Sequence, residues 1–354
     1  MIKLEDLLRL VVKEEASDLH LTVGTPPQLR IDEKLVPAKL ASLAPEDTQR
    51  ITYSILSEEQ KQEFESNLEL DLSFGIKDVG RFRANIFRQR GSIGAAFRLI
   101  PSRIPSFTGL GLPKVVEKLA SLPKGLVLVT GPTGCGKSTT LAALVEKINN
   151  ERHCHIITVE DPIEYIHKHK KSIVNQREVG SDTHSFARAL KYILREDPDI
   201  ILIGEMRDVE TVRMALESAE TGHLVFATLH TSDAAQTMNR IIDIFPSNQQ
   251  NQVRTQLSFV IQAVICQQLI PKREGKGRVL STEVMIATPA VRALIREEKV
   301  HQIYSVIQTG NSVGMHTMNQ SFYKLYRKGL ISYGEALSRT TDVDDLERLF
   351  RQSL

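Results

Sequence analysis

Apolar residues in the first hundred positions switch between helical and strand-like spacing. They recur every three or four residues over 4–13 and again over 45–68, which predicts helices there. Over 18–23 they alternate with polar residues as in a strand, and residues 31–35 are typical of a turn between two strands. We therefore predict a mixed α+β domain over residues 1–100, with further short strands at 70–74, 81–89 and 94–99.

Residues 101–113 interrupt both patterns. The segment carries Pro101, Pro105 and Pro113 together with Gly109 and Gly111. Proline lacks the backbone N–H and fixes φ, so this composition continues neither a helix nor a strand. Domain boundaries commonly fall in such segments, and we predict a linker here.

From residue 114 onward, strongly apolar strands alternate with amphipathic helices. This alternation is typical of an α/β domain in which a parallel sheet is covered by helices on both faces. We predict such a domain over residues 114–280, followed by a mostly helical region over residues 281–354. The strands are expected at 126–130, 155–159, 200–204 and 224–228, and the helices from 137, around 185–195 and from 209.

The composition limits the cellular setting more than it identifies a partner. The 45 Lys and Arg residues nearly balance the 43 Asp and Glu residues, so the net charge of +2 provides no strong field for nucleic acid or anionic membranes. The apolar runs are too short to cross a bilayer, and the acidic start of the chain differs from a signal peptide. The three cysteines form no Cys-x-x-Cys pair for zinc or redox chemistry. We expect a cytoplasmic protein with reduced thiols.

The strongest chemical signal is a phosphate-binding loop of the pattern Gly-x-x-x-x-Gly-Lys-Ser at residues 131–138. It follows an apolar strand and opens a helix, which is the context that this motif requires. Backbone N–H groups of such a loop surround phosphates, Lys137 reaches the β- and γ-phosphates, and Ser138 is placed to hold Mg²⁺. The alternative is an ordinary glycine-rich turn. The predicted ATP-binding residues are Gly131, Pro132, Thr133, Gly134, Cys135, Gly136, Lys137, Ser138 and Thr139.

Carboxylates follow two of the other predicted strands. Glu205 ends the apolar run 199–204, where it is suited to polarise the attacking water directly or through Mg²⁺. An acid after a strand can instead cap a helix, but its pairing with a phosphate-binding loop favours catalysis. Glu160 and Glu164 belong to an acidic cluster after the strand at 155–159, which indicates either a Mg²⁺ or water site or a solvated turn.

Histidines and arginines offer further candidate groups. His223 and His230 bracket the strand at 224–228, and a neutral imidazole there would sense the γ-phosphate or be a hydrogen-bonded core residue. Five arginines lie on the alternating segments of the first domain and mostly share one strand face. Such a row is either a solvated face or a source of arginine fingers for a neighbouring subunit. They are Arg81, Arg83, Arg88, Arg90 and Arg98.

Taken together, these motifs resemble the secretion ATPase superfamily and, within it, the type IV pilus retraction ATPases. The resemblance covers essentially the whole chain, and its motifs are specific as a set. The similar segments are residues 17–21, the phosphate-binding loop, the acidic box 158–164, the segment 174–180, the Walker B box 203–208, the His box 221–231 and the segment 314–321.

The resemblance implies a homohexameric ring of two-domain subunits with ATP and Mg²⁺ at the subunit boundaries. The first domain would be PAS-like, and the second RecA-like with a helical C-terminal region. Glu205 would be the catalytic glutamate and His230 a γ-phosphate contact, while the candidate arginine fingers are Arg81, Arg83 and Arg98. The short N-terminal region and the lack of a four-cysteine zinc module favour retraction over extension or type II secretion.

The expected activity is ATP hydrolysis that drives disassembly of pilin filaments and hence twitching motility. The expected partner is a PilC-like platform protein in the inner membrane, so the ring would lie at the cytoplasmic face and reach the membrane only through partners. Residues 290–297 read Ala-Val-Arg-Ala-Leu-Ile-Arg-Glu, where the retraction family carries Ala-Ile-Arg-Asn-Leu-Ile-Arg-Glu. This departure leaves an accessory retraction paralogue as an alternative.

Two other classes of protein remain as alternatives. RecA-like rings also translocate nucleic acid, but the sequence has no Trp, only 5% aromatic residues and a single dense cationic run at 167–171. No nucleic-acid partner is expected on this basis. A non-motor regulator that uses nucleotide as an assembly switch is disfavoured by the catalytic carboxylates.

Overall fold

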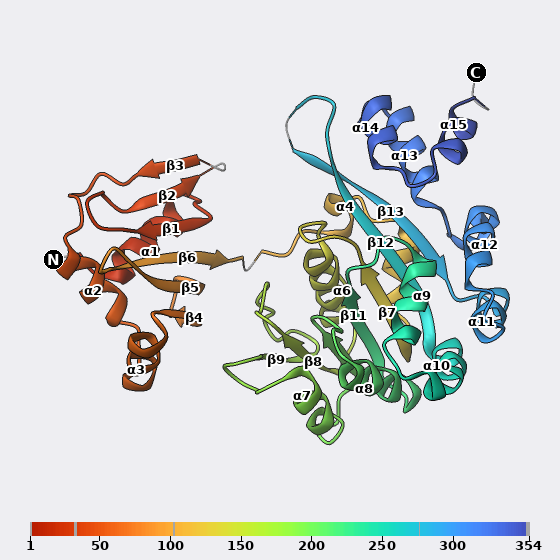
Figure 1. The fold of residues 1–354 in the computed structure, drawn as a ribbon, viewed down its shortest axis with the longest axis horizontal. Coiled ribbons are helices and arrows are strands. Elements are labelled where there is room, and N and C mark those ends of the chain that lie inside the picture. Colours follow the sequence, from red (N-terminus) through yellow and green to blue (C-terminus); the bar gives the residue numbers. More distant parts are fainter. Residues whose placement is uncertain (1, 32–33, 102, 276, 352–354) are drawn as a thin grey trace. The chain divides into compact units, whose positions relative to one another are not determined.

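The computed structural model describes residues 2–31, 34–101, 103–275 and 277–351. The chain forms two compact units, one from Met1–Arg103 with Glu164–Ile166 and the other from Ile104–Ile163 and His167–Leu354. Each has a sheet of its own (Figure 1). The division falls within the predicted linker, whose Ser102 lies outside the described residues. Residues 32–33 of the predicted turn and 352–354 of the predicted helical region lie outside them as well.

The first unit is an antiparallel sheet in the order β3-β2-β1-β6-β5-β4 that shares one core with three helices. Phe82, Ala84 and Ile86 of β5 point into this core. The alternate residues of β5, including Arg81 and Arg83, lie on the outer face because neighbouring side chains on a strand point to opposite sides. The elements are α1 (Leu4–Lys13), β1 (Asp18–Leu21), β2 (Gln28–Ile31), β3 (Lys34–Pro37), α2 (Pro45–Tyr53), α3 (Glu58–Asn67), β4 (Glu69–Ile76), β5 (Gly80–Gln89) and β6 (Ser92–Ile100).

The second unit contains a sheet in the order β13-β12-β7-β11-β10-β8-β9. All neighbouring pairs are parallel except β12 with β13. The strands are β7 (Gly125–Thr130), β8 (His155–Glu160), β9 (Ile173–Glu178), β10 (Ile200–Ile203), β11 (Leu224–Leu229), β12 (Ile261–Pro271) and β13 (Arg278–Ile286).

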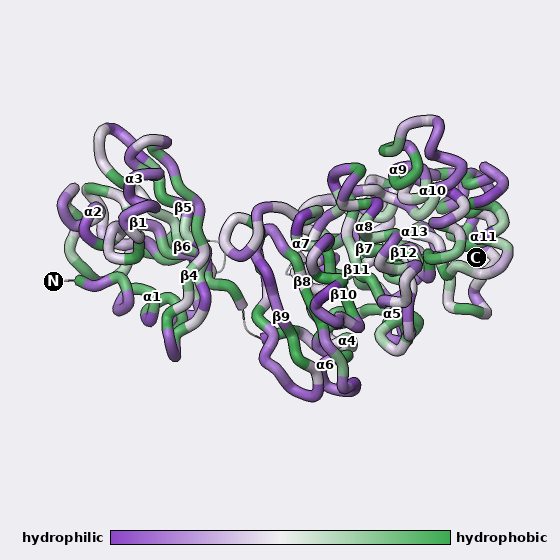
Figure 2. The backbone as a smooth tube through the Cα atoms, turned by 90° about the horizontal axis from the view of Figure 1, so that it is seen from below, coloured by the Kyte–Doolittle hydropathy of each residue, from purple (hydrophilic) through white to green (hydrophobic). Residues whose placement is uncertain are grey.

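Helices cover both faces of this sheet, as its apolar strands require. One face packs on α5 and α6, and the other on α7 to α12. Figure 2 shows the central strands mainly in green, the colour of hydrophobic residues. The helices are α4 (Phe107–Leu110), α5 (Lys114–Leu119), α6 (Lys137–Glu151), α7 (Phe186–Ile193), α8 (Val209–Glu220), α9 (Ala234–Asp243), α10 (Ser247–Val260), α11 (Pro289–Arg296) and α12 (Ile303–Thr309).

The edge of the sheet differs from the prediction in one respect. The helical region was expected from residue 281, but β13 continues to Ile286 and the next helix, α11, begins at Pro289. The antiparallel pair β12 and β13 does not follow the βα alternation, and polar Gln267 and Gln268 interrupt the apolar run of β12. Hydrophobic periodicity therefore does not predict a strand at residues 281–286.

The C-terminal helices form a separate small core against the end of β12, and a buried carboxylate joins them. Asp345 of α15 accepts hydrogen bonds from the Tyr304 hydroxyl at 2.8 Å and from the Asn319 amide at 3.0 Å. The last helices are α13 (Met318–Arg327), α14 (Tyr333–Arg339) and α15 (Val343–Arg351). In the described part of the chain no helix is both long enough and apolar enough to span a bilayer.

Arg292 of α11 closes the C-terminal end of α10. Its guanidinium donates to the carbonyl oxygens of Ser258 and Phe259, both at 2.7 Å, and to the side chain of Gln262 at 3.2 Å. The last carbonyls of a helix have no partner within the helix, so a cation there stabilises it. The basic position that residues 290–297 share with the retraction ATPases thus has a structural role in this chain.

We predict that Arg292→Met lowers the free energy of unfolding of the second unit by about 2 kcal/mol, because two carbonyl oxygens at the end of α10 lose a charged donor. Urea denaturation followed by circular dichroism measures this. The matched control is Arg296→Met, since Arg296 is exposed and lies against the ring of Phe259. Its expected effect is within about 0.5 kcal/mol. Equal losses in the two variants would contradict the capping role.

Candidate nucleotide site

Four parallel strands, β7, β8, β10 and β11, end on the same edge of the second sheet. Thr130 pairs with Leu229, and Ile203 pairs with both Ala227 and Val159. The segments that follow these strands therefore start side by side. Ligands of α/β proteins bind at this carboxyl edge. The predicted phosphate-binding loop, Glu160, Glu205 and His230 all follow these strand ends.

Gly131 lets the loop begin directly against β12. Its φ is 136°, and a Cβ at this position would lie 2.4 Å from the carbonyl oxygen of Gln267 and 2.7 Å from the Cys135 sulfur. Any side chain would therefore displace backbone. The loop ends at Gly136, which precedes the first residue of α6 with φ of 92°. Glycine alone adopts these angles readily, so the curled loop is specified by its sequence.

Lys137 folds back over the loop. Its ammonium donates to the carbonyl oxygens of Gly131 at 2.8 Å and Pro132 at 3.2 Å. Burial lowers the pKa of this ammonium, while Cys135 and Glu205 act in the opposite direction. The N-terminus of α6 carries no acidic residue in its first turn. A positive ammonium and the N-terminus of a helix at one place are suited to phosphate.

Glu205 is held between two basic side chains. Its two carboxylate oxygens accept from the Arg207 guanidinium at 2.7 Å and from the Nε2 atom of His230 at 3.1 Å. Burial by itself raises the pKa of Glu205, but the hydrogen bonds and charges of Arg207 and His230 outweigh it and the net pKa is lowered. The carboxylate is thus ionised at neutral pH, as a group that orients water requires.

Glu160 lies at the end of β8 within a hydrogen-bonded group. Its Oε1 atom accepts from the Thr158 hydroxyl at 2.6 Å and from the Gln176 amide at 3.2 Å. These bonds orient the carboxylate at the sheet edge. Glu164 comes after the cis bond between Asp161 and Pro162.

The arginines of the first unit come together as the strand pattern predicted. Arg81 and Arg83 lie two residues apart on β5, and Arg98 of β6 is the cross-strand partner of Arg83. Arg98 donates to Asp18 at 2.8 Å, and Arg83 lies 3.9 Å from Asp71. Like charges directly opposite on a sheet are unfavourable, and these acids offset them. Arg88 falls on the other side of β5, and Arg90 lies beyond its end.

Sequence reasoning did not identify several residues that shape the site. Arg207 follows Glu205 by two positions, and this spacing was a usable signal. No comparable sequence signal marks Glu178 and Gln267, because each lies on a strand that is distant in sequence from the segment it contacts. The buried Glu178 accepts from the Ile163 N–H at 3.1 Å and so fixes the acidic loop, while the Gln267 amide donates to Thr140 of α6 at 2.7 Å.

Solved structures of other proteins share this architecture. A crystal structure of the pilus retraction motor PilT with bound ADP matches with a TM-score of 0.92 and 54% identity, covering 98% of this chain and all of that one. The Legionella pneumophila ATPase DotB matches with a TM-score of 0.81 and 26% identity, over 95% of each chain.

Two proteins of Pseudomonas aeruginosa are similar in sequence. The type IV pilus retraction ATPase PilT is 52% identical over 92% of this chain and 95% of its own length. The type IV pilus ATPase PilU is 42% identical over 99% of this chain and 92% of its own. The type II/IV secretion system protein family matches residues 3–337. The chain therefore belongs to this family of secretion ATPases.

Proposed function

We propose that the chain is the hexameric motor that powers type IV pilus retraction by hydrolysing ATP. The observation that carries the catalytic part is Glu205, which is kept ionised by Arg207 and His230 on the same sheet edge as the phosphate-binding loop. The nearly full-length similarity to PilT supports the motor part. In this proposal Glu205 orients the attacking water, and His230 contacts the γ-phosphate.

The oxygen donors near the loop fit Mg²⁺, the metal that this chemistry uses. Ser138 offers a hydroxyl in the first turn of α6, and Glu160 offers a carboxylate already oriented by Thr158 and Gln176. Hydroxyl and carboxylate oxygens are ligands that Mg²⁺ accepts alongside phosphates and water. When bound, the ion offsets the negative charge of the phosphates. Residues 131–137 and Thr139 would hold the nucleotide.

Arg81, Arg83 and Arg98 are proposed as the source of positive charge for a neighbouring subunit's site. They form one cationic group on the outer face of the first sheet. Asp71, the acid beside Arg83, is exposed, and Asp18, the acid beside Arg98, also interacts with Arg30. Glu164 is proposed as an auxiliary carboxylate of the acidic loop. The ring would act on a PilC-like platform protein at the cytoplasmic face of the inner membrane, and through it on the pilin filament.

An accessory retraction role is the second candidate. PilU matches this chain over almost its whole length, and Ala293 stands where the retraction pattern has Asn. Ala293 lies on α11, whose Arg292 already caps α10. The change keeps the cap and removes one side-chain amide from a half-buried position.

Glu205→Gln is expected to bind ATP and hydrolyse it about 10²- to 10⁴-fold more slowly, since the amide cannot act as a base for water. Steady-state phosphate release and the affinity for a fluorescent ATP analogue measure the two properties. The control is Glu210→Gln, which alters an acid in the first turn of α8 without touching this site. Near-normal turnover in Glu205→Gln would remove Glu205 from the catalytic role.

Mixed rings test whether the arginines act between subunits. A subunit lacking Arg81, Arg83 and Arg98 is inactive alone in this proposal, and so is Glu205→Gln. Random mixing at equal concentration should restore about a quarter of the sites, because an intact Glu205 then meets intact neighbouring arginines. Absence of any recovery in rings shown to be hexameric would refute action in trans.

Deletion of the gene separates the principal motor from the accessory role. If the chain is the principal motor, cells keep pili that extend but never shorten, and twitching stops. Fluorescently labelled pili followed by microscopy give the retraction frequency directly. Complementation with the Glu205→Gln variant should leave the defect in place. Retraction that persists at reduced force would instead support the accessory candidate.

A further inference from the structure

Glu283 has the lowest exposed fraction of any acid in the described residues, at 2%. It lies on β13, opposite Cys266 of β12. A charged group is expensive to bury unless it is hydrogen-bonded or paired. The position therefore needs a structural reason, and the proposed catalytic residues do not include it.

The Glu283 carboxylate faces the first N–H groups of two different helices. Its Oε1 atom accepts from Ala234, the first residue of α9, at 2.9 Å. The N–H of Met318, the first residue of α13, acts on the same carboxylate and lowers its pKa. The side-chain caps Asp233 and Thr317 take N–H groups further along, those of the third helical residues. Glu283 thus completes the N-termini of both helices, where a negative charge is stabilised.

The α9 contact fixes the segment that carries His230. Only three residues separate His230 from Ala234, and Thr231 is hydrogen-bonded to Thr237 of α9 at 2.7 Å. His230 in turn donates to Glu205 at 3.1 Å. The beginning of α9 therefore determines where the imidazole lies relative to the catalytic carboxylate.

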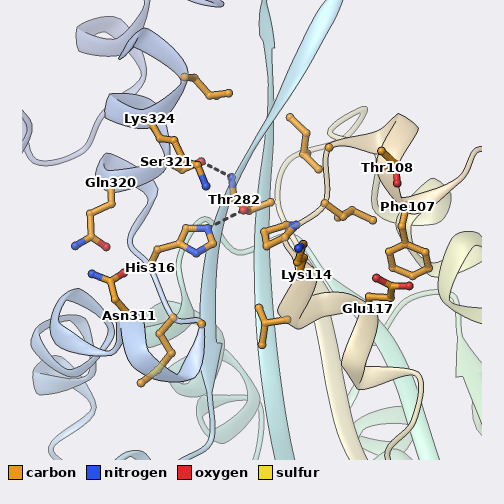
Figure 3. A pocket seen from close by; sticks show the side chains of 18 of the residues that line it. Phe107, Thr108, Lys114, Glu117, Thr282, Asn311, His316, Gln320, Ser321 and Lys324 are labelled. Atoms are coloured by element: carbon orange, nitrogen blue, oxygen red, sulfur yellow. Dashed lines mark hydrogen bonds between the residues drawn. The ribbon is translucent and has the colours of Figure 1, made fainter. Parts of the chain in front are cut away.

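The α13 contact fixes the C-terminal helices on the edge strand. Figure 3 shows His316 and Ser321 pointing to Thr282 of β13, with hydrogen bonds of 2.9 and 3.1 Å. A cavity of about 850 Å³ lies between α5 and α13, on the Thr282 side of β13. Figure 3 shows side chains that line it. Apolar side chains do not fill this side of α13. The position of α13 therefore depends more on its polar contacts to β13.

We propose that Glu283 is a positioning residue of the nucleotide site, which joins the His230 segment to the start of α13 through one buried carboxylate. This inference rests on the proposed ATP hydrolysis. It means that the place of His230 beside Glu205 and the place of the C-terminal helices depend on the same group. Removing the charge of Glu283 therefore disturbs both places at once.

The charge of this carboxylate is sensitive to pH. Burial raises the pKa of Glu283 to about 7, although the N–H groups of Ala234 and Met318 act against the rise. The ionised form accepts both N–H groups, whereas the protonated form has less acceptor capacity. Other titratable or charged groups also line this region. They are Asp233 at the N-cap of α9, Cys266 of β12, Tyr304 of α12, Arg339 of α14 and Asp342.

Glu283→Gln keeps the shape and removes the charge, so it is the main test. We expect kcat to fall about tenfold while KM for ATP stays within about twofold, because the phosphate-binding loop is untouched. In the wild type kcat should rise with pH around an apparent pKa near 7, and this rise should be absent in the variant. Glu283→Asp, which keeps the charge but is shorter, should recover part of the activity.

Asp345→Asn is the matched control, because Asp345 is a buried acid that joins the C-terminal helices without contacting α9. It should lower the melting temperature while leaving kcat near the wild-type value. If Glu283→Gln lowers only the melting temperature and leaves kcat and its pH profile unchanged, Glu283 is merely structural and the inference is wrong.

Hydrogen exchange gives a readout that does not depend on turnover. Glu283→Gln should speed exchange in residues 230–237 and 314–321 together, whereas Asp345→Asn should affect the second segment alone. Unchanged exchange in residues 230–237 would overturn the inference, even where the wild type hydrolyses ATP. If the wild type does not hydrolyse ATP but Glu283→Gln still speeds exchange in both segments, the proposed function is refuted and the structural link through Glu283 stands.

Discussion

The central constraint on this molecule is a parallel sheet buried on both faces. The residues of β7, β10 and β11 are almost completely shielded from water, so no charged side chain can be placed along them. The charged groups of the candidate site therefore lie at or just beyond the ends of the strands. The parallel direction of these strands then brings the phosphate-binding loop, Glu205 and His230 to one edge, although they are far apart in sequence.

Electrostatic balance at that edge comes from neighbours rather than from solvent. Glu205 is 20% exposed as a side chain, and burial alone would favour its protonated form. Arg207 and His230 reverse this. The same reasoning explains Lys137, whose ammonium is satisfied by two loop carbonyls. The partners that hold Glu205 and Lys137 in place thus belong to the same chain.

The sequence was sufficient for features that depend on local pattern. The phosphate-binding loop, the apolar strands and the outward row of Arg81 and Arg83 follow from motif and periodicity. Features that depend on distant strands were not predictable. β12 and β13 form an antiparallel pair with polar residues in an apolar run. Gln267 and Glu283 act on segments that are distant in the sequence, the helices α6 and α9. Periodicity carries no information about such contacts.

The contacts of Glu205 to Arg207 and to His230 differ in how easily they can be broken. The Arg207 side chain is 67% exposed, and an exposed ion pair contributes only about 0–1 kcal/mol, so Arg207 can leave at little cost. His230 lies on a short segment held by α9 and, through Ala234, by the buried Glu283. Moving His230 therefore requires a change in buried contacts. Phosphate chemistry at this site is expected to displace the arginine first, and to move the histidine only together with the helices anchored on β13.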